Sequence, residues 1–178
     1  SQIVRTDFLS GAMENNSATL HQVNAYQNER QFVDGNSWEE TIAHELFHQW
    51  FGDLVTTESW SNLTVNESFA NYSEYLWDEH KYGKDTADEH NLDDMQGYLR
   101  SNSDRKNLVR YQYSDNEDRF DAVSYNKGGR ILHMLRNYVG DDAFFKSLNN
   151  YVRTNKFKTG EAAKLTLAFK EGTGKEMN

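Results

Sequence analysis

The chain has 178 residues, with 19 lysines and arginines against 28 aspartates and glutamates, and it contains no cysteine. This length suits a single domain with a buried core, and the missing thiols exclude disulfide frameworks, thiolate metal sites and cysteine nucleophiles. The net charge of −9 argues against nucleic acids and anionic membranes as partners, because both attract clustered cations. No apolar run approaches the roughly 18 residues of a membrane span, so we expect no membrane contact in this segment.

Short strands are predicted near the N-terminus, followed by a helix. Residues 2–9 and 18–26 carry β-branched and aromatic side chains without a helical stripe, which is typical of strands. From Trp38 to Trp50 an apolar residue recurs every four positions, which predicts a helix with this stripe as its apolar face. Ser37 and Glu40 form the pattern of a capping box at the start of the helix, and Gly52 is the expected stop.

The remainder of the chain predicts further helices. Apolar residues at helical spacing, bounded by glycine or small polar residues, predict helices over 65–82, 85–101, 122–139, 141–154 and 160–171. Residues 102–120 are rich in aspartate, asparagine and arginine and are expected to be irregular. Short strands followed by a run of helices indicate an α+β fold, which we expect to form one domain over residues 1–178.

A metal site is indicated by the sequence His44-Glu45-Leu46-Phe47-His48. Histidines four positions apart lie about 40° apart around a helix, so both imidazoles can reach one ion. Glu45 is placed to hold a water beside that ion without ligating it. The alternative for the pentapeptide alone is a chance arrangement of the 6 histidines in the chain.

A third ligand is predicted at Glu67, 19 residues after His48 and near the start of the next helix. A catalytic zinc uses three protein ligands and keeps a fourth position open, and two imidazoles with one carboxylate suit this ion. Glu74 follows two helical turns later on the same face, where its carboxylate can receive the N–H of a ligand histidine. The alternatives are a glutamate that stabilises the helix N-terminus, for Glu67, and an ordinary solvated glutamate, for Glu74.

Three motifs follow one another along the chain, namely Gly11-Ala12-Met13-Glu14-Asn15, then the stretch 44–52 with Asn66-Glu67-Ser68-Phe69-Ala70, then Tyr125-Asn126-Lys127-Gly128. Together they resemble the exopeptidase motif, the zinc site and the catalytic-tyrosine motif of the aminopeptidase N family. This family of zinc metallo-aminopeptidases includes leukotriene hydrolase and belongs to the gluzincins. Weaker similarity extends from about residue 8 to residue 169. The resemblance implies a thermolysin-like catalytic domain, with a small β-sheet edge followed by a mostly α-helical zinc-binding lobe.

The resemblance also implies roles for the residues of the metal site. His44, His48 and Glu67 would bind one zinc ion, which polarises the scissile carbonyl. Glu45 would be the general base that takes the proton of the attacking water and returns it to the leaving amine. Tyr125 would donate its hydroxyl to the tetrahedral oxyanion. Without the motif, a tyrosine before a glycine-rich helix start indicates ordinary packing.

Substrate binding is implied for the first motif. Glu14 would bind the α-ammonium group of the substrate, and the strand around Gly11 and Ala12 would hydrogen-bond the substrate backbone. The expected partners are therefore peptides with a free N-terminus. Outside the motif, Glu14 would be an ordinary acidic residue of a turn.

The chain departs from the family at a few positions. Ser68 follows the third ligand where the family usually has glycine, and Asn16-Ser17 replaces a usual tryptophan-glycine after the exopeptidase motif. Full-length relatives carry a β-rich domain before this module and a helical domain after it. Since the chain also starts without methionine, we interpret it as an excerpt of a larger multidomain enzyme.

We expect a zinc aminopeptidase module. A thermolysin-type endopeptidase, which would not need Glu14, is the alternative within the same chemistry. A zinc-bound binding module with little turnover in this truncated form is the alternative of a different class. The other histidines lack partners at ligand spacing and are expected on the surface or in the core with satisfied hydrogen bonds; they are His21, His80, His90 and His133.

Overall fold

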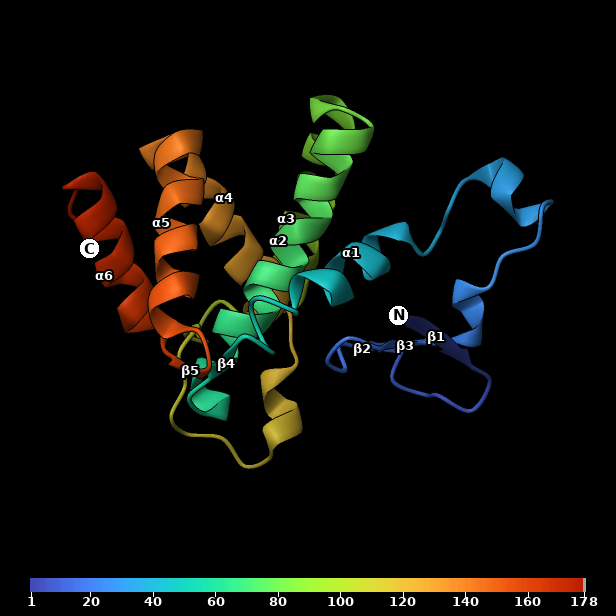
Figure 1. The fold of residues 1–178 in the computed structure, drawn as a ribbon, viewed down its shortest axis with the longest axis horizontal. Helices are drawn as coiled ribbons and strands as arrows, with labels where there is room; N and C mark the ends of the chain where they lie inside the picture. Colours follow the sequence, from blue (N-terminus) through green and yellow to red (C-terminus); the bar gives the residue numbers. More distant parts are fainter. Residues whose placement is uncertain (178) are drawn as a thin grey trace.

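A small sheet lies at one end of a helical body in the computed structural model, which describes residues 1–177 (Figure 1). β1 (Gln2–Arg5) pairs in parallel with β3 (Thr19–Gln22), and β2 (Ala12–Met13) pairs antiparallel with the other side of β3. The predicted strands over 2–9 and 18–26 are therefore real but shorter than expected. β2 corresponds to the strand that the family resemblance implied around Gly11 and Ala12; its two residues are too few to show an alternating pattern of their own.

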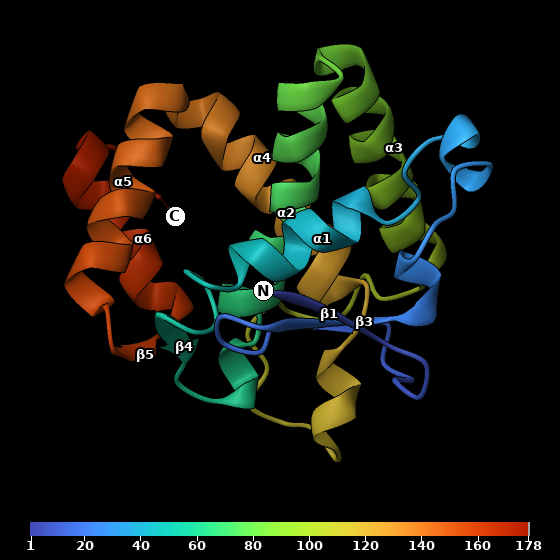
Figure 2. The same cartoon turned by 45° about the vertical axis from the view of Figure 1, so that its right-hand side comes forward.

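The described residues contain six α-helices, α1 (Glu39–Phe47), α2 (Thr64–Lys81), α3 (Lys84–Arg100), α4 (Gly128–Val139), α5 (Asp141–Asn155) and α6 (Ala162–Thr173). A second sheet pairs β4 (Val55–Thr57) in parallel with β5 (Lys158–Gly160). Figures 1 and 2 show α1 lying across α2, with the three-stranded sheet on one side and α4, α5 and α6 on the other. The α+β architecture is confirmed.

The first helix begins later than its sequence pattern predicts. α1 starts at Glu39 with Trp38 at its N-cap, and no side chain caps its amides. The predicted capping box of Ser37 and Glu40 is therefore wrong. A capping box needs the hydroxyl of Ser37 at the N-cap position, but in the structure Trp38 occupies that position.

The end of α1 and its buried face also differ from the expectation. The helix stops at Phe47 rather than at Gly52, because two of the next amides bond back to carbonyls only three positions away. The buried residues of α1 are His44 and Glu45, whereas Trp50, at the end of the apolar stripe, is 51% exposed. The stripe thus predicted the helix but not the face that packs against α2.

The other helices largely match the prediction. α2 and α3 lie within one residue of their predicted bounds, and α5 and α6 lie within two. The helix predicted over 122–139 instead begins with a π-helical turn, Val123–Lys127, which leads into α4. The stretch predicted as irregular contains one short 3₁₀ turn, Asn116–Arg119, that is capped by Asp115.

α2 is the central helix of the fold. It packs against α1, α3, α4 and the π-helical turn, and most of its residues are buried. Phe69 of α2 stacks on Phe51 from the turn after α1, with ring centroids 4.1 Å apart. This packing fixes the end of α1 against the start of α2, the place where the predicted metal ligands lie.

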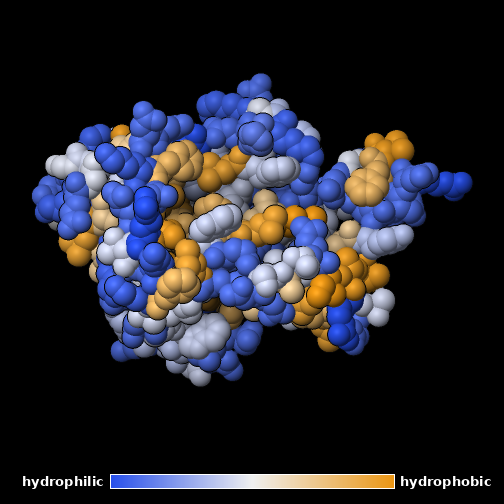
Figure 3. Space-filling view, in the orientation of Figure 1, coloured by the Kyte–Doolittle hydropathy of each residue, from blue (hydrophilic) through white to orange (hydrophobic). Residues whose placement is uncertain are grey.

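Apolar side chains remain exposed on the three-stranded sheet. Ile3 and Val4 of β1 and Leu9 after it are exposed, and Figure 3 shows apolar surface over this sheet at the right of the view. Within residues 1–177, no helix has both the length and the apolar character needed to cross a bilayer.

Candidate functional site

Two histidines of α1 and one glutamate of α2 meet in a buried cluster. Nε2 of His44 lies 3.4 Å from Oε2 of Glu67, and Nε2 of His48 lies 3.5 Å from the same oxygen. Ligand atoms of the three residues lie within 4.8 Å of one another, and all three residues are buried. An ion between these atoms would have two imidazole nitrogens and one carboxylate as ligands, which is a donor set that zinc prefers.

The second ring nitrogen of each histidine is also engaged. Nδ1 of His44 lies 2.6 Å from Oε1 of Glu74, two turns after Glu67 on α2. Nδ1 of His48 lies 2.9 Å from the carbonyl oxygen of Phe51, in the turn that ends α1. When each Nδ1 donates its proton in these contacts, the Nε2 lone pairs face the cluster and are available to a metal. The geometry of the described residues therefore fits zinc.

The carboxylates also strengthen proton binding by these histidines. Burial lowers the pKa of His44, but its hydrogen bonds with Glu67 and Glu74 raise that pKa to about 10. The pKa of His48 is raised by Glu67 against the opposing effect of burial. Burial favours protonation of Glu67, yet the two imidazoles lower its pKa to about 2. Metal and protons therefore compete for this cluster, and zinc uptake would release protons.

Glu45 lies beside the three candidate ligands. Its Oε2 is buried and has no hydrogen-bond partner among the described residues. Burial raises the pKa of Glu45 to about 7, an effect that the two histidines oppose and that Glu14 and Glu67 reinforce. A carboxylate with a pKa near neutrality can both accept and return a proton near pH 7, as a general base must.

Tyr125 reaches the same cluster from a distant part of the chain. It lies in the π-helical turn, and its ring is nearly parallel to the imidazole of His44, with centroids 5.9 Å apart and planes at 12°. Burial and the charge of Glu67 raise the pKa of its hydroxyl. The group therefore stays protonated near pH 7 and can act as a hydrogen-bond donor.

The N-terminal sheet brings Glu14 to the cluster. One oxygen of Glu14, one oxygen of Glu45 and one ring nitrogen of His48 lie within 4.8 Å of one another. Nε2 of Gln49 donates to the carbonyl of Glu14 at 3.0 Å, and Oε1 of Gln49 accepts from the amide of Ser17 at 3.0 Å. Gln49 thus holds the Glu14 turn against the end of α1. Gln49 was assigned no role from the sequence, although it follows the predicted ligand His48 directly.

Gly11 and Ala12 lie at an edge of the three-stranded sheet, shortly before Glu14 in the chain. Ala12 pairs with His21 on one side of β2, and no strand within residues 1–177 pairs with the other side. Gly11 has a φ of +80°, in the left-handed region that glycine adopts without strain. The open side of β2 can offer backbone N–H and C=O groups to an extended peptide.

Three of the other histidines have the surroundings that the sequence predicted. His80 is exposed on α2. His21 is buried, with Nε2 at 3.0 Å from the hydroxyl of Thr19, and its Nδ1 accepts from the indole of Trp38. His133 packs edge-on against the ring of Tyr75.

His90 of α3 differs, because it lies among four carboxylates, one of which, Glu74, also contacts the candidate metal ligand His44. Its Nδ1 is 3.1 Å from Oδ2 of Asp78 and 3.6 Å from Oε1 of Glu40. Its Nε2 is 3.6 Å from Oε2 of Glu74 and 3.7 Å from Oδ2 of Asp94. Burial lowers the pKa of His90, but its hydrogen bond with Glu40 and the charges of Glu74 and Asp94 raise that pKa to about 9. The sequence carried no signal for this cluster, because its acids come from three different helices.

Replacing His90 by glutamine should destabilise the protein at pH 6 more than at pH 10. The pKa of His90 rises from 6.5 to about 9 on folding, so its stabilising effect is complete below pH 6.5 and is lost as the pH rises through 9. Urea denaturation should show a free energy of unfolding roughly 1–3 kcal/mol lower at pH 6, with the difference from wild type shrinking toward pH 10.

The exposed histidine on α2 supplies the control for this experiment. His80→Gln should leave the free energy of unfolding unchanged at either pH, because His80 is exposed. A deficit in His90→Gln that is equally large at pH 6 and pH 10 would contradict ion pairing and would mean that His90 acts through packing alone.

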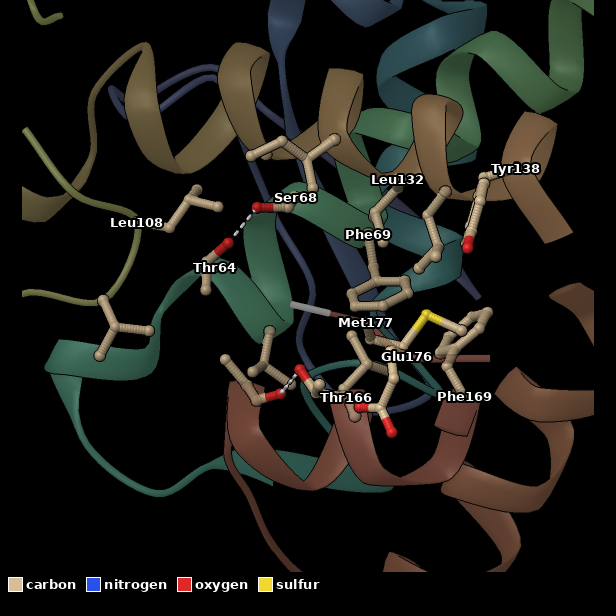
Figure 4. Close-up of a pocket in the computed structure, with 17 residues that line it drawn as sticks. Thr64, Ser68, Phe69, Leu108, Leu132, Tyr138, Thr166, Phe169, Glu176 and Met177 are labelled. Carbon is tan, nitrogen blue, oxygen red and sulfur yellow. Dashed lines mark hydrogen bonds between the residues drawn. The ribbon is translucent and has the colours of Figure 1, made fainter. Parts of the chain in front are cut away.

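An apolar cavity of about 580 Å³ lies apart from the candidate metal ligands. It is lined by residues of α2, α4 and α6 and of the stretch before the π-helical turn, as Figure 4 shows for Leu108, Leu132 and Phe169. None of the candidate metal ligands lines it. Polar groups that could perform chemistry gather instead between α1, α2 and β2.

The whole chain, residues 1–178, matches the Peptidase family M1 domain. It is 31% identical over 179 residues to Aminopeptidase M1 of Arabidopsis thaliana and 35% identical over 181 residues to Tricorn protease-interacting factor F2 of Thermoplasma volcanium. Each match covers 97% of this chain but only 20% and 23% of those proteins. A solved M1 zinc metallopeptidase mutant of Deinococcus radiodurans, bound to a Tyr-Ser-Ala substrate, is similar at a TM-score of 0.73 and 29% identity, over 98% of this chain and 36% of that one. The chain therefore belongs to peptidase family M1.

Proposed function

We propose that residues 1–178 are the catalytic module of a zinc aminopeptidase that removes N-terminal residues from peptides, within a longer enzyme. The observation that carries the proposal is the position of Glu14, whose carboxylate lies within 4.8 Å of Glu45 and His48. An acidic group at this distance from a candidate metal cluster suits a substrate that has a cation one residue away from the bond to be cleaved. A free N-terminus is such a cation.

His44, His48 and Glu67 are the residues that would hold the zinc ion. When bound, zinc supplies Lewis-acid chemistry, polarising a carbonyl and making a water molecule more acidic. Glu74 would keep the His44 ring oriented through its 2.6 Å contact with Nδ1. The remaining chemistry is assigned to side chains of the chain itself.

Glu45 and Tyr125 would perform the proton transfer and the stabilisation of charge. Glu45 has a buried oxygen without a partner and a pKa of about 7, so it can take a proton from water and return it to the leaving amine. Tyr125 keeps its proton and lies over His44, so its hydroxyl can donate a hydrogen bond to the oxyanion that develops on the scissile carbonyl.

The edge of the sheet would hold the peptide itself. Gly11 and Ala12 border the open side of β2, so a substrate lying there would extend the sheet through its backbone. Glu14 follows directly after β2 and would bind the α-ammonium group. Because Gln49 ties this turn to α1, the ammonium site and the metal ligands have a fixed separation.

Acetylating the N-terminus of a substrate should lower kcat/KM by at least about tenfold, the equivalent of 1.4 kcal/mol. The α-amino group has a pKa of about 7.7–8.0, so it is mostly charged at pH 7 and can make a charge-assisted hydrogen bond with Glu14. Hydrolysis of matched free and acetylated peptides measures this discrimination. Glu14→Ala should remove most of it while leaving the zinc content unchanged.

Two variants serve as controls. Glu14→Gln keeps the size of the side chain but not its charge, and it should lose the discrimination as Glu14→Ala does. Glu29→Ala, which removes an exposed acid from the connection between β3 and α1, should retain it. If wild type cleaves free and acetylated peptides equally well, the aminopeptidase proposal fails and a thermolysin-type endopeptidase takes its place.

A further inference from the structure

We propose that Ser68 is a positioning residue that holds Tyr125 at the metal cluster. This inference rests on the proposed function and adds to it a residue outside the reacting groups. Ser68 follows the candidate ligand Glu67 on α2 and is only 2% exposed. Successive residues of a helix point about 100° apart, so Glu67 can face the metal cluster while its neighbour faces the π-helical turn.

The hydroxyl of Ser68 joins α2 to the turn that carries Tyr125. Oγ of Ser68 donates to the carbonyl oxygen of Ser124 at 2.7 Å. Figure 4 shows Ser68 directed to the hydroxyl of Thr64, one turn earlier on α2, with which it is also hydrogen-bonded. Since a serine hydroxyl has one proton, Thr64 donates to Ser68 and Ser68 donates to the carbonyl. The proton order in this chain of bonds is therefore fixed.

Gly128 leaves the space that the side chain of Ser68 occupies. A Cβ atom added to Gly128 would lie 1.8 Å from Oγ of Ser68, so any side chain at position 128 would clash with this hydroxyl. The absence of a side chain at Gly128 is what lets the hydroxyl reach the backbone of the turn.

The bridge acts on the residue directly before Tyr125. Other bonds hold neighbouring parts of the turn: Asp121 accepts from the amides of Val123 and Ser124, and Asn126 donates to Asp94 at 2.6 Å. The Ser68 bond differs from these because its donor sits on α2 beside a metal ligand. The Ser68 bond therefore holds the turn at a fixed distance from α2, and with it the position of Tyr125 relative to the candidate ligands.

A double-mutant cycle tests whether Ser68 works through the tyrosine hydroxyl. Ser68→Ala should lower kcat about three- to tenfold, the range of one lost hydrogen bond, with KM and zinc content nearly unchanged. Tyr125→Phe should lower kcat more. If the two residues act as a unit, Ser68→Ala should have little further effect on kcat in the Tyr125→Phe background.

Ser73→Ala is the matched control. Ser73 is also a buried serine of α2, but its hydroxyl donates to Ala70 of the same helix. It should lower thermal stability about as much as Ser68→Ala while leaving kcat unchanged. Effects of Ser68→Ala and Tyr125→Phe that simply multiply, or an unchanged kcat in Ser68→Ala, would overturn the positioning role.

A second measurement does not depend on turnover. Amide hydrogen exchange over residues 122–128 should be faster in Ser68→Ala than in wild type or Ser73→Ala, because one anchor of the turn is lost. Unchanged exchange would refute the inference even if the protein had no peptidase activity. An inactive wild type, by contrast, would count against the proposed function alone.

Discussion

Glu45→Gln should reduce turnover at least a hundredfold and leave one zinc ion per chain. Glutamine can still hydrogen-bond a water, but it cannot accept a proton from it, and general acid–base catalysis contributes about 10²–10⁴ in rate. Glu45 is not one of the three proposed ligands, His44, His48 and Glu67, so the zinc content should not change. Steady-state hydrolysis of an aminoacyl amide and metal analysis of the same sample measure both quantities.

A measurement of thermal stability distinguishes the loss of the general base from unfolding of the variant. Burial raises the pKa of Glu45 to about 7, so the folded protein binds this proton more tightly than the unfolded chain, and the associated stability is lost as the pH rises through 7. At pH 8 metal-free Glu45→Gln should therefore unfold at no lower temperature than metal-free wild type. Glu39→Gln, on the same helix but paired with Lys81, should keep full activity. Near-normal turnover in Glu45→Gln would place the base on another residue.

His48→Ala should abolish zinc binding and, with it, activity. Removing one of three ligands leaves an imidazole and a carboxylate, which is too few for a catalytic zinc site. His48 is also buried and bonded to the carbonyl of Phe51, so the variant loses a contact at the end of α1 as well. Purified wild type should contain about one zinc per chain, and His48→Ala should contain almost none.

The exposed His80 again provides the comparison. His80→Ala removes an imidazole from α2 without touching the cluster and should keep its zinc and its turnover. Addition of zinc to metal-free wild type should lower the pH of a weakly buffered solution, because the metal displaces protons held by His44 and His48. Equal zinc content in wild type and His48→Ala would refute the ligand assignment.

The parts of the fold that could be predicted are those whose cause is local. α2 and α3 have continuous helical patterns and a glycine between them, and their bounds were predicted within one residue. β4 and β5 could not be predicted, since each has three residues and its partner lies about 100 positions away. The apolar stripe on α1 was misleading about burial, because its polar face is the one that packs against α2.

The residues of the candidate site likewise include some that local spacing predicts and others that depend on how the elements pack. Helical spacing alone places His44 and His48 on one face of α1, and it places Glu74 two turns from Glu67 on α2. Gln49 and His90 act through contacts with residues 30 or more positions away or with several helices at once. Such contacts depend on how the elements pack, and no spacing rule within one segment contains that information.

The π-helical turn makes the placement of Tyr125 a matter of chain length. A π-turn holds one residue more than an α-turn, and each residue advances a helix by about 100°. Deleting one residue within Val123–Lys127 would let α4 continue backward as a regular helix and would rotate the tyrosine away from His44 by about that angle. Insertions and deletions in this turn should therefore be tolerated far less well than exchanges of one side chain for another.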